Sequence, residues 1–175
     1  MADLDPRRFP IGPFNPRTQL TNEDREHLMA ELGAFPGIFR ATVEKLSDEA
    51  LETPYREGGW TLRQVVHHVP DSHMQGYVRF KLALTESVPE IRTYEQEAWG
   101  ETEDARTAPV ECSLDLLEAL HKRWVFALRS LSPEDFARTY RHPDMGELDL
   151  EKTLQLYVWH GKHHLAHIRL VAPSG

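Results

Sequence analysis

Hydrophobic residues recur at helical spacing in four long segments of the chain. The predicted helices cover residues 21–46, 61–86, 113–131 and 150–171. In each of them apolar residues stand three or four positions apart, so one face can be buried while the opposite face stays polar. This pattern predicts an all-α protein in which four helices pack as a bundle.

Local signals mark the ends and the irregularities of these helices. Thr21, Thr61 and Ser113 each precede a helical pattern, and their hydroxyl groups can accept hydrogen bonds from the free N–H groups of a first helical turn. Pro36 and Pro70 fall inside the first and second helices. A proline in a helix interior removes one hydrogen bond, so Pro36 is expected to kink or interrupt the first helix, and Pro70 to bend the second just after His67 and His68.

The connections between the predicted helices are irregular. Residues 87–111 show no hydrophobic period and are rich in charge. A connection of this length between the second and third helices is too long for a simple helical hairpin and predicts a crossover. Weak alternation around Asp144-Met-Gly146 predicts a small β-hairpin before the last helix.

The first twenty residues contain four prolines. Proline resists helix formation, so residues 1–20 are predicted to form an extended arm laid on the protein surface or on a partner. A chain of 175 residues is long enough to bury a core of its own. We therefore expect a single domain over residues 1–175 that includes this arm.

Composition excludes several classes of function. The formal net charge is −8, and an acidic protein lacks the basic surface that nucleic-acid binding requires. No apolar stretch approaches the roughly 18 residues that span a bilayer, and the N-terminus lacks the apolar core of a signal peptide. The lone Cys112 excludes an internal disulfide and fits a reducing compartment. These features predict a cytoplasmic protein that binds neither nucleic acid nor membranes.

Histidines are the most informative residues of the chain. His160 and His164 stand four positions apart on the last predicted helix, as do His163 and His167, so each pair lies on one helix face and can hold a single metal ion. A second cluster lies on the second predicted helix. It consists of His67, His68 and His73. A pair plus a distant third imidazole makes a three-ligand site, but helical periodicity leaves open which member of the second cluster takes part.

Several motifs along the chain are, taken together, those of one known family. The longest covers residues 55–68, and another lies within residues 157–167, in Tyr-Val-Trp-His and His-His-Leu-Ala-His. Shorter ones are Pro10-Ile-Gly12, Asp71-Ser-His-Met74, Arg79-Phe-Lys-Leu82, Ile91-Arg-Thr-Tyr94, Ala98-Trp99 and His142-Pro-Asp144. In these motifs the chain resembles the DinB/YfiT-like family of small metal-binding helical proteins over nearly its whole length.

The resemblance has implications for fold, assembly and metal ligands. It implies an up-down-down-up four-helix bundle and a homodimer. By motif position it implies that His68, His160 and His164 bind the metal, which leaves the other histidines of the two clusters as neighbours. Members of the YfiT branch of this family are known as metal-dependent hydrolases and have also been linked to transfer of the thiol bacillithiol.

Three neutral imidazoles would leave a divalent ion positively charged with at least one open position, as in catalytic zinc sites. Such an ion lowers the pKa of bound water to about 7, which supports hydrolysis of a small-molecule substrate. It can equally hold the thiolate of a low-molecular-weight thiol. The chain is therefore predicted to be a metal-dependent hydrolase. The alternatives are a bacillithiol S-transferase and a non-catalytic metal-binding stress protein.

We expect one divalent ion per subunit, with Zn²⁺ ahead of Ni²⁺.

The residues that would handle protons are harder to assign. The spacing of His160 and His164 is that of a His-Glu-x-x-His metalloprotease, but Gly161 replaces the glutamate that acts there as general base. A base must come from elsewhere. The candidate catalytic residues are Asp71, which lies one helical turn after His68, and His163.

Other residues have two interpretations each. Tyr94 and Trp99 are candidates to wall the pocket, or they anchor the long connection in which they lie. Arg79 and Lys81 are candidates to attract an acidic thiol, or they form exposed salt bridges.

Overall fold

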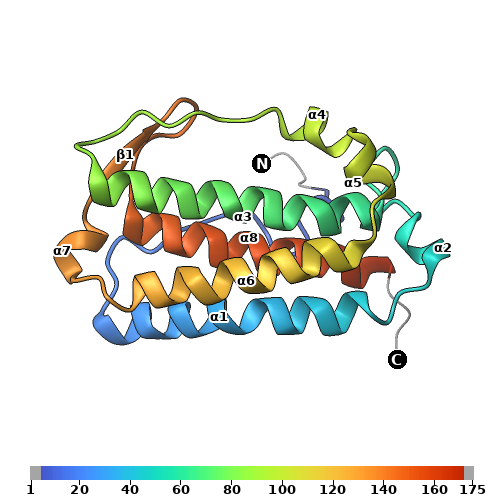
Figure 1. The fold of residues 1–175 in the computed structure, drawn as a ribbon, viewed down its shortest axis with the longest axis horizontal. Coiled ribbons are helices and arrows are strands. Elements are labelled where there is room, and N and C mark those ends of the chain that lie inside the picture. The colour runs from blue at the N-terminus through green and yellow to red at the C-terminus, as the bar shows by residue number, and fades with distance from the viewer. Residues whose placement is uncertain (1–4, 172–175) are drawn as a thin grey trace.

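The structure is a computed structural model that describes residues 5–171. Four long helices run the length of the molecule: α1 (Asn22–Val43), α3 (Leu62–Thr85), α6 (Val110–Leu128) and α8 (Leu150–Val171) (Figure 1). The shorter elements are α2 (Asp48–Leu51), α4 (Gln96–Gly100), α5 (Glu103–Thr107), α7 (Pro133–Phe136), β1 (Thr139–His142) and β2 (Gly146–Asp149). The predicted four-helix bundle is confirmed. Within residues 5–171, none of the helices combines the length and hydrophobicity needed to cross a membrane.

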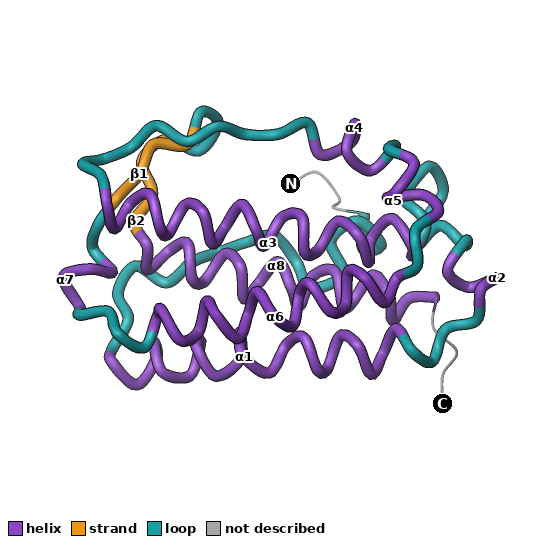
Figure 2. Tube along the Cα trace, in the orientation of Figure 1, coloured by secondary structure: helices purple, strands orange, loops and turns teal. Residues whose placement is uncertain are grey.

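The direction of the helices gives the bundle its topology. In Figure 1, α1 and α8 run one way while α3 and α6 run the other, which is the up-down-down-up order that the family resemblance implies. Each of α1 and α3 packs against both α6 and α8. The parallel pair α3 and α6 requires a connection that returns along the whole bundle. Figure 2 shows this connection as a loop beside α3 that ends in α4 and α5.

Capping residues start the first two long helices as predicted. The hydroxyl of Thr21 accepts a hydrogen bond from the backbone N–H of Asp24, and the hydroxyl of Thr61 accepts one from that of Gln64. In both cases the side chain three residues into the helix bonds back to the cap, which satisfies two free donors at once. Pro36 and Pro70 lie inside α1 and α3, and both helices continue through them.

Two predictions about helices were wrong in detail. Helix α6 begins at Val110 rather than after Ser113, because Pro109 supplies a fixed backbone angle suited to a helix start. The hydroxyl of Ser113 is therefore free to bond His67 instead of capping the helix. The stretch predicted to lack structure contains α4 and α5, whose five residues each are too short to show a hydrophobic period.

The predicted hairpin before the last helix is present. Strands β1 and β2 pair antiparallel, with Tyr140 opposite Leu148 and His142 opposite Gly146. Gly146 adopts a positive φ of 72°, which glycine tolerates without strain, and so closes the turn. The side chains of Tyr140 and Leu148 are buried against the end of the bundle.

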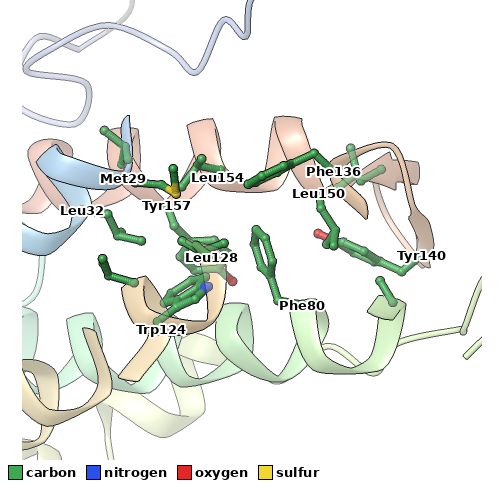
Figure 3. Close-up of a cluster of buried hydrophobic side chains, with 14 of the residues drawn as sticks. Met29, Leu32, Phe80, Trp124, Leu128, Phe136, Tyr140, Leu150, Leu154 and Tyr157 are labelled. Atoms are coloured by element: carbon green, nitrogen blue, oxygen red, sulfur yellow. The ribbon is translucent and has the colours of Figure 1, made fainter. Parts of the chain in front are cut away.

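Two hydrophobic clusters fill the bundle. The cluster at the hairpin end, drawn in Figure 3, includes Phe80, Trp124 and Tyr157 from three different long helices. The cluster at the α2 end includes Phe39, Leu62, Val66, Leu117 and Ile168. Between them lies a polar layer, since the fully buried His73 contacts both Phe35 of the second cluster and Trp124 of the first.

The N-terminal arm lies along α8. The backbone N–H of Arg17 donates to Gln155 Oε1 at 2.8 Å, and the Gln155 amide donates back to the carbonyl of Arg17 at 3.1 Å. The arm is not extended throughout, because residues 5–12 form hydrogen-bonded turns. Residues 1–4 of the predicted arm lie outside the described residues.

Candidate metal centre

Three histidines converge where α3 lies beside α8. Each of His68, His160 and His164 offers a ring nitrogen that lies within 4.8 Å of the other two. The ring centroid of His68 is 5.3 Å from that of His160 and 4.8 Å from that of His164, and the two α8 rings are 4.5 Å apart. The structure therefore brings together the three residues that the family resemblance selects.

The hydrogen bonds of these rings leave nitrogens free for a metal ion. Nδ1 of His160 bonds Nε2 of His73 at 3.2 Å, and Nδ1 of His164 bonds Nδ1 of His167 at 3.3 Å. Among the described residues, Nε2 of His160 and of His164 has no hydrogen-bond partner, and His68 has none on either nitrogen. One free nitrogen on each ring is the donor set that a three-imidazole site requires.

All three rings are neutral at neutral pH. Burial lowers the pKa of His68 to about 4, with the nearby His163 and His167 as smaller causes. Burial is also the main reason why the pKa values of His160 and His164 lie well below the usual 6.5. Neutral imidazole is the form that binds a metal, so the ligands need not lose protons first.

A chain of hydrogen bonds fixes the orientation of His160. Its Nδ1 bonds His73, Nδ1 of His73 bonds Nε2 of His121 at 2.8 Å, and Nδ1 of His121 bonds the carbonyl of Leu32 at 2.7 Å. Because a carbonyl only accepts, neutral His121 must carry its proton on Nδ1. His73 therefore donates from Nδ1 to Nε2 of His121, and His160 donates from Nδ1 to Nε2 of His73. Because the proton of His160 is on Nδ1, its Nε2 keeps the lone pair that can bind a metal ion.

The relay of hydrogen bonds from His160 through His73 and His121 to Leu32 leads to a prediction about metal affinity. The substitution His73→Phe removes the acceptor for His160, and we expect it to weaken metal binding by about 10-fold to 100-fold. Competition with a chromogenic chelator measures the affinity. His67→Phe is the matched control, because His67 is also a buried histidine of α3 but bonds Ser113 and the carbonyl of Ala108. Unchanged affinity in His73→Phe would show that the relay does not position the ligand.

His163, one predicted catalytic residue, lies beside the three rings. It stacks on Trp159 with 4.6 Å between the ring centroids, and its buried Nδ1 has no hydrogen-bond partner among the described residues. Burial and then His167 lower its pKa to about 4, which makes it a weak base at neutral pH. His167 itself stacks on Tyr55 at 4.1 Å and bonds the carbonyl of Arg8.

Asp71, the other predicted catalytic residue, is not brought to the three histidines. It is half-buried on α3 and does not line the cleft into which they open. Burial and then repulsion from Asp104 raise the pKa of its carboxyl group to about 6. A catalytic role for Asp71 therefore remains a prediction without a contact to support it.

The raised pKa of Asp71 predicts a pH-dependent effect on stability. Above pH 6 the folded protein must hold a half-buried carboxylate, whereas below its unfolded pKa of 3.8 the group is protonated in both states. Asp71→Asn should thus match the wild type well below pH 3.8, become increasingly more stable than it between pH 3.8 and about 6, and hold that advantage at higher pH. Urea unfolding of both proteins across this range measures the difference. A constant difference would contradict the raised pKa.

The three rings open into a cleft of about 300 Å³. Trp60 packs on His68, with 4.8 Å between the ring centroids, and donates from Nε1 to Glu97 at 3.1 Å. The arm contributes Arg8 and Phe9 to the lining of the cleft. Sequence reasoning missed Trp60 as a cleft residue, although it lies inside the longest family motif.

His121 was also missed, and its position carried a signal. It stands four residues after Leu117 and three before Trp124, on the apolar stripe of α6. The structure buries His121 and leaves Leu120 half-buried. A histidine on an apolar helix face needs a buried partner, which here is the relay.

Gly161 explains why the metalloprotease glutamate is absent. A Cβ atom built on Gly161 would stand 3.0 Å from the ring of Phe35. A glutamate would clash with α1 at this position, so the α8 histidine pair cannot carry the metalloprotease base.

A second chamber adjoins the cleft. It has a volume of about 610 Å³ and shares His160, Gln96 and Glu97 with the cleft. Tyr94 lines this chamber, whereas Trp99 lines neither cavity and packs on Tyr94 with 4.6 Å between the ring centroids. The long connection thus contributes Tyr94 as a wall and Trp99 as its support.

Comparison with known proteins places the chain in a family. The profile of the DinB superfamily matches residues 31–168. The chain belongs to the DinB superfamily. This DinB protein is 48% identical over 161 residues to the Bacillus subtilis protein named "Putative metal-dependent hydrolase YfiT", with 91% of the chain and 90% of the relative covered. It is 50% identical over 168 residues to a Bacillus cereus protein that is also named a putative metal-dependent hydrolase, with 96% and 95% covered.

Solved structures support the same placement. The structure of Bacillus subtilis YfiT, described as a probable metal-dependent hydrolase with an unusual four-helix bundle topology, matches with a TM-score of 0.92 at 46% identity. The match covers 94% of this DinB protein and 95% of YfiT. The four-helix bundle protein TT2238 matches with a TM-score of 0.56 at 22% identity, over 81% of this chain and 94% of that one, and supports the fold alone.

Proposed function

We propose that this DinB protein is a metal-dependent hydrolase whose ion is held by His68, His160 and His164. The observation that carries the proposal is the convergence of three free imidazole nitrogens within 4.8 Å, at the floor of an open cleft. The names of its relatives agree with this activity. Zn²⁺ is the proposed ion because three neutral imidazoles with an open position suit it, and Ni²⁺ is the second candidate.

The residues around the ion would have separate tasks. A divalent ion bound there supplies a Lewis acid and lowers the pKa of a coordinated water to about 7. Trp60 covers His68 and holds Glu97 at the edge of the cleft. The relay through His73 fixes the tautomer of His160, so the site needs little reorganisation when it is loaded. The cleft volume of about 300 Å³ fits a small-molecule substrate.

One observation favours a second candidate, transfer of a low-molecular-weight thiol such as bacillithiol. Neither predicted base is suited to deprotonating water in the cleft: the pKa of His163 is lowered to about 4, and Asp71 does not line the cleft. A thiol ionises more readily than water, so a thiolate nucleophile would not require such a base. The homodimer that the family resemblance implies stays a prediction.

A single assay separates these functions. The zinc- and nickel-loaded protein is given activated esters and amides, and separately electrophiles, each with and without bacillithiol. Hydrolysis without thiol that requires the metal is the expected result. Adduct formation that requires the thiol would instead establish the transferase. Metal binding without any turnover would leave only the non-catalytic stress protein.

A further inference from the structure

Arg79 is a charged residue buried inside the bundle. It lies on α3, on the floor of the second chamber, and is only 8% exposed. Its Nη1 donates to the hydroxyl of Tyr157 at 3.1 Å, whereas its Nε is buried without a hydrogen-bond partner. A buried guanidinium is costly unless charges or hydrogen-bond acceptors around it offset the lost contact with water.

Among residues 5–171, no carboxylate oxygen lies within 4.0 Å of a nitrogen of Arg79, although thirteen other such pairs of a basic and an acidic side chain occur there. A buried charge without a counterion is costly and persists where a function requires it. The free side of the charge faces a chamber of about 610 Å³.

The chamber offers further donors around the guanidinium. The side chains of Ser72, Tyr94 and His142 line it together with Tyr157. Burial raises the pKa of Tyr94 to about 12, so its hydroxyl keeps its proton. Burial and then the charge of Arg79 lower the pKa of His142, so this ring is neutral at neutral pH. These groups can complete the hydrogen bonds of a small anion, and a guanidinium fits a carboxylate or a phosphate with two parallel bonds.

The rim of the chamber limits the charge of its ligand. Glu95, Glu97 and Asp144 line the mouth of the chamber and are exposed. The protein also carries a formal net charge of −8. Such a rim repels polyanions but is screened by water, so a single anionic group on a small molecule can pass.

The chamber and the metal cleft are joined at His160, which lines both. We propose that Arg79 forms an anion subsite that holds a carboxylate or phosphate group of the substrate while another part of the same molecule reaches the three histidines. That the bound molecule is a substrate rests on the proposed hydrolase function. The binding site itself does not depend on any activity.

Binding can be tested without turnover. The Nε–Hε NMR signal of Arg79, identified by its loss in Arg79→Met, is followed while sodium acetate and inorganic phosphate are added in separate titrations. Metal-free and zinc-loaded protein are both used, so binding at the ion is distinguished from binding at Arg79. We expect a saturable shift of this signal in both forms, and the anion with the lower saturating concentration identifies the group. No saturable shift with either anion would overturn the proposal.

A matched pair of esters tests the substrate class. 4-Nitrophenyl acetate is neutral, and mono-4-nitrophenyl succinate adds one carboxylate. The zinc protein should favour the charged ester, and Arg79→Met should lower this preference in kcat/KM by about 10-fold or more, as loss of a charged hydrogen bond implies. Arg92→Met is the control, because Arg92 is an exposed arginine of the neighbouring connection. An equal preference in wild type and Arg79→Met would overturn the substrate assignment. Absence of any hydrolysis would count against the proposed function and leave the NMR result standing.

Discussion

The substitution His164→Ala should abolish metal-dependent turnover and weaken metal binding by more than about 100-fold. Replacing a residue that only supports a ligand costs about 10-fold to 100-fold, so the loss of one of three ligands must cost more. His164 is also the ring closest to both other rings, at 4.8 Å from His68 and 4.5 Å from His160 between centroids. Two remaining imidazoles cannot hold a divalent ion with comparable affinity.

Thermal unfolding measures this effect without an assay for activity. Zinc at 100 times its dissociation constant stabilises a folded protein by about 2.7 kcal/mol, so it should raise the Tm of the wild type. His164→Ala should show no such rise. His27→Ala should behave like the wild type, because the His27 side chain is 75% exposed and lies beside Glu31 of the same helix. A zinc-induced rise in the His164→Ala protein equal to that of the wild type would exclude His164 as a ligand.

The substitution Gly76→Ala should destabilise the fold by about 1–3 kcal/mol, although alanine is normally the better helix former. Gly76 lies in the middle of α3, where a Cβ atom would stand 2.6 Å from Trp124 and closer still to the ring of Tyr157. Both rings are buried members of the core cluster drawn in Figure 3. The added methyl group must therefore push α3 away from α6 and α8.

Gly37→Ala provides a control of opposite sign. Gly37 lies inside α1, and a Cβ atom there would meet nothing within 4 Å. Alanine at this position should stabilise the protein by about 0.5–1 kcal/mol. Urea unfolding of both variants gives the two free energies. Equal effects of the two substitutions would show that close packing at Gly76 does not limit the approach of the helices.

The sequence predicts the long elements of this fold well because their signals are local. The hydroxyls of Thr21 and Thr61 mark two helix starts, and a 22-residue α8 repeats its apolar positions often enough to be unambiguous. The short helices α2, α4 and α5 escaped prediction since four or five residues complete barely one turn. The start of α6 was misplaced because Pro109, and not Ser113, stands at the helix start, while the Ser113 hydroxyl bonds His67 on a distant segment.

The candidate site was predictable only in part. Helical spacing identified His160 and His164 as a pair, but only the family resemblance selected His68 over His67 and His73. The structure gives the physical reason: the adjacent rings of α3 point to different neighbours, so His67 bonds the start of α6 while His68 faces α8. The relay, Trp60 and the second chamber depend on contacts between distant segments, which periodicity cannot show.

X-ray absorption of the zinc-loaded protein tests the central claim most directly. The spectrum reports which atoms surround the ion and at what distance, independently of any substrate. Three imidazole nitrogens at about 2.0–2.1 Å with one further light-atom ligand is the result that we predict. A spectrum with fewer than three imidazoles, or one that is unchanged in His68→Ala, would contradict a metal centre built by His68, His160 and His164.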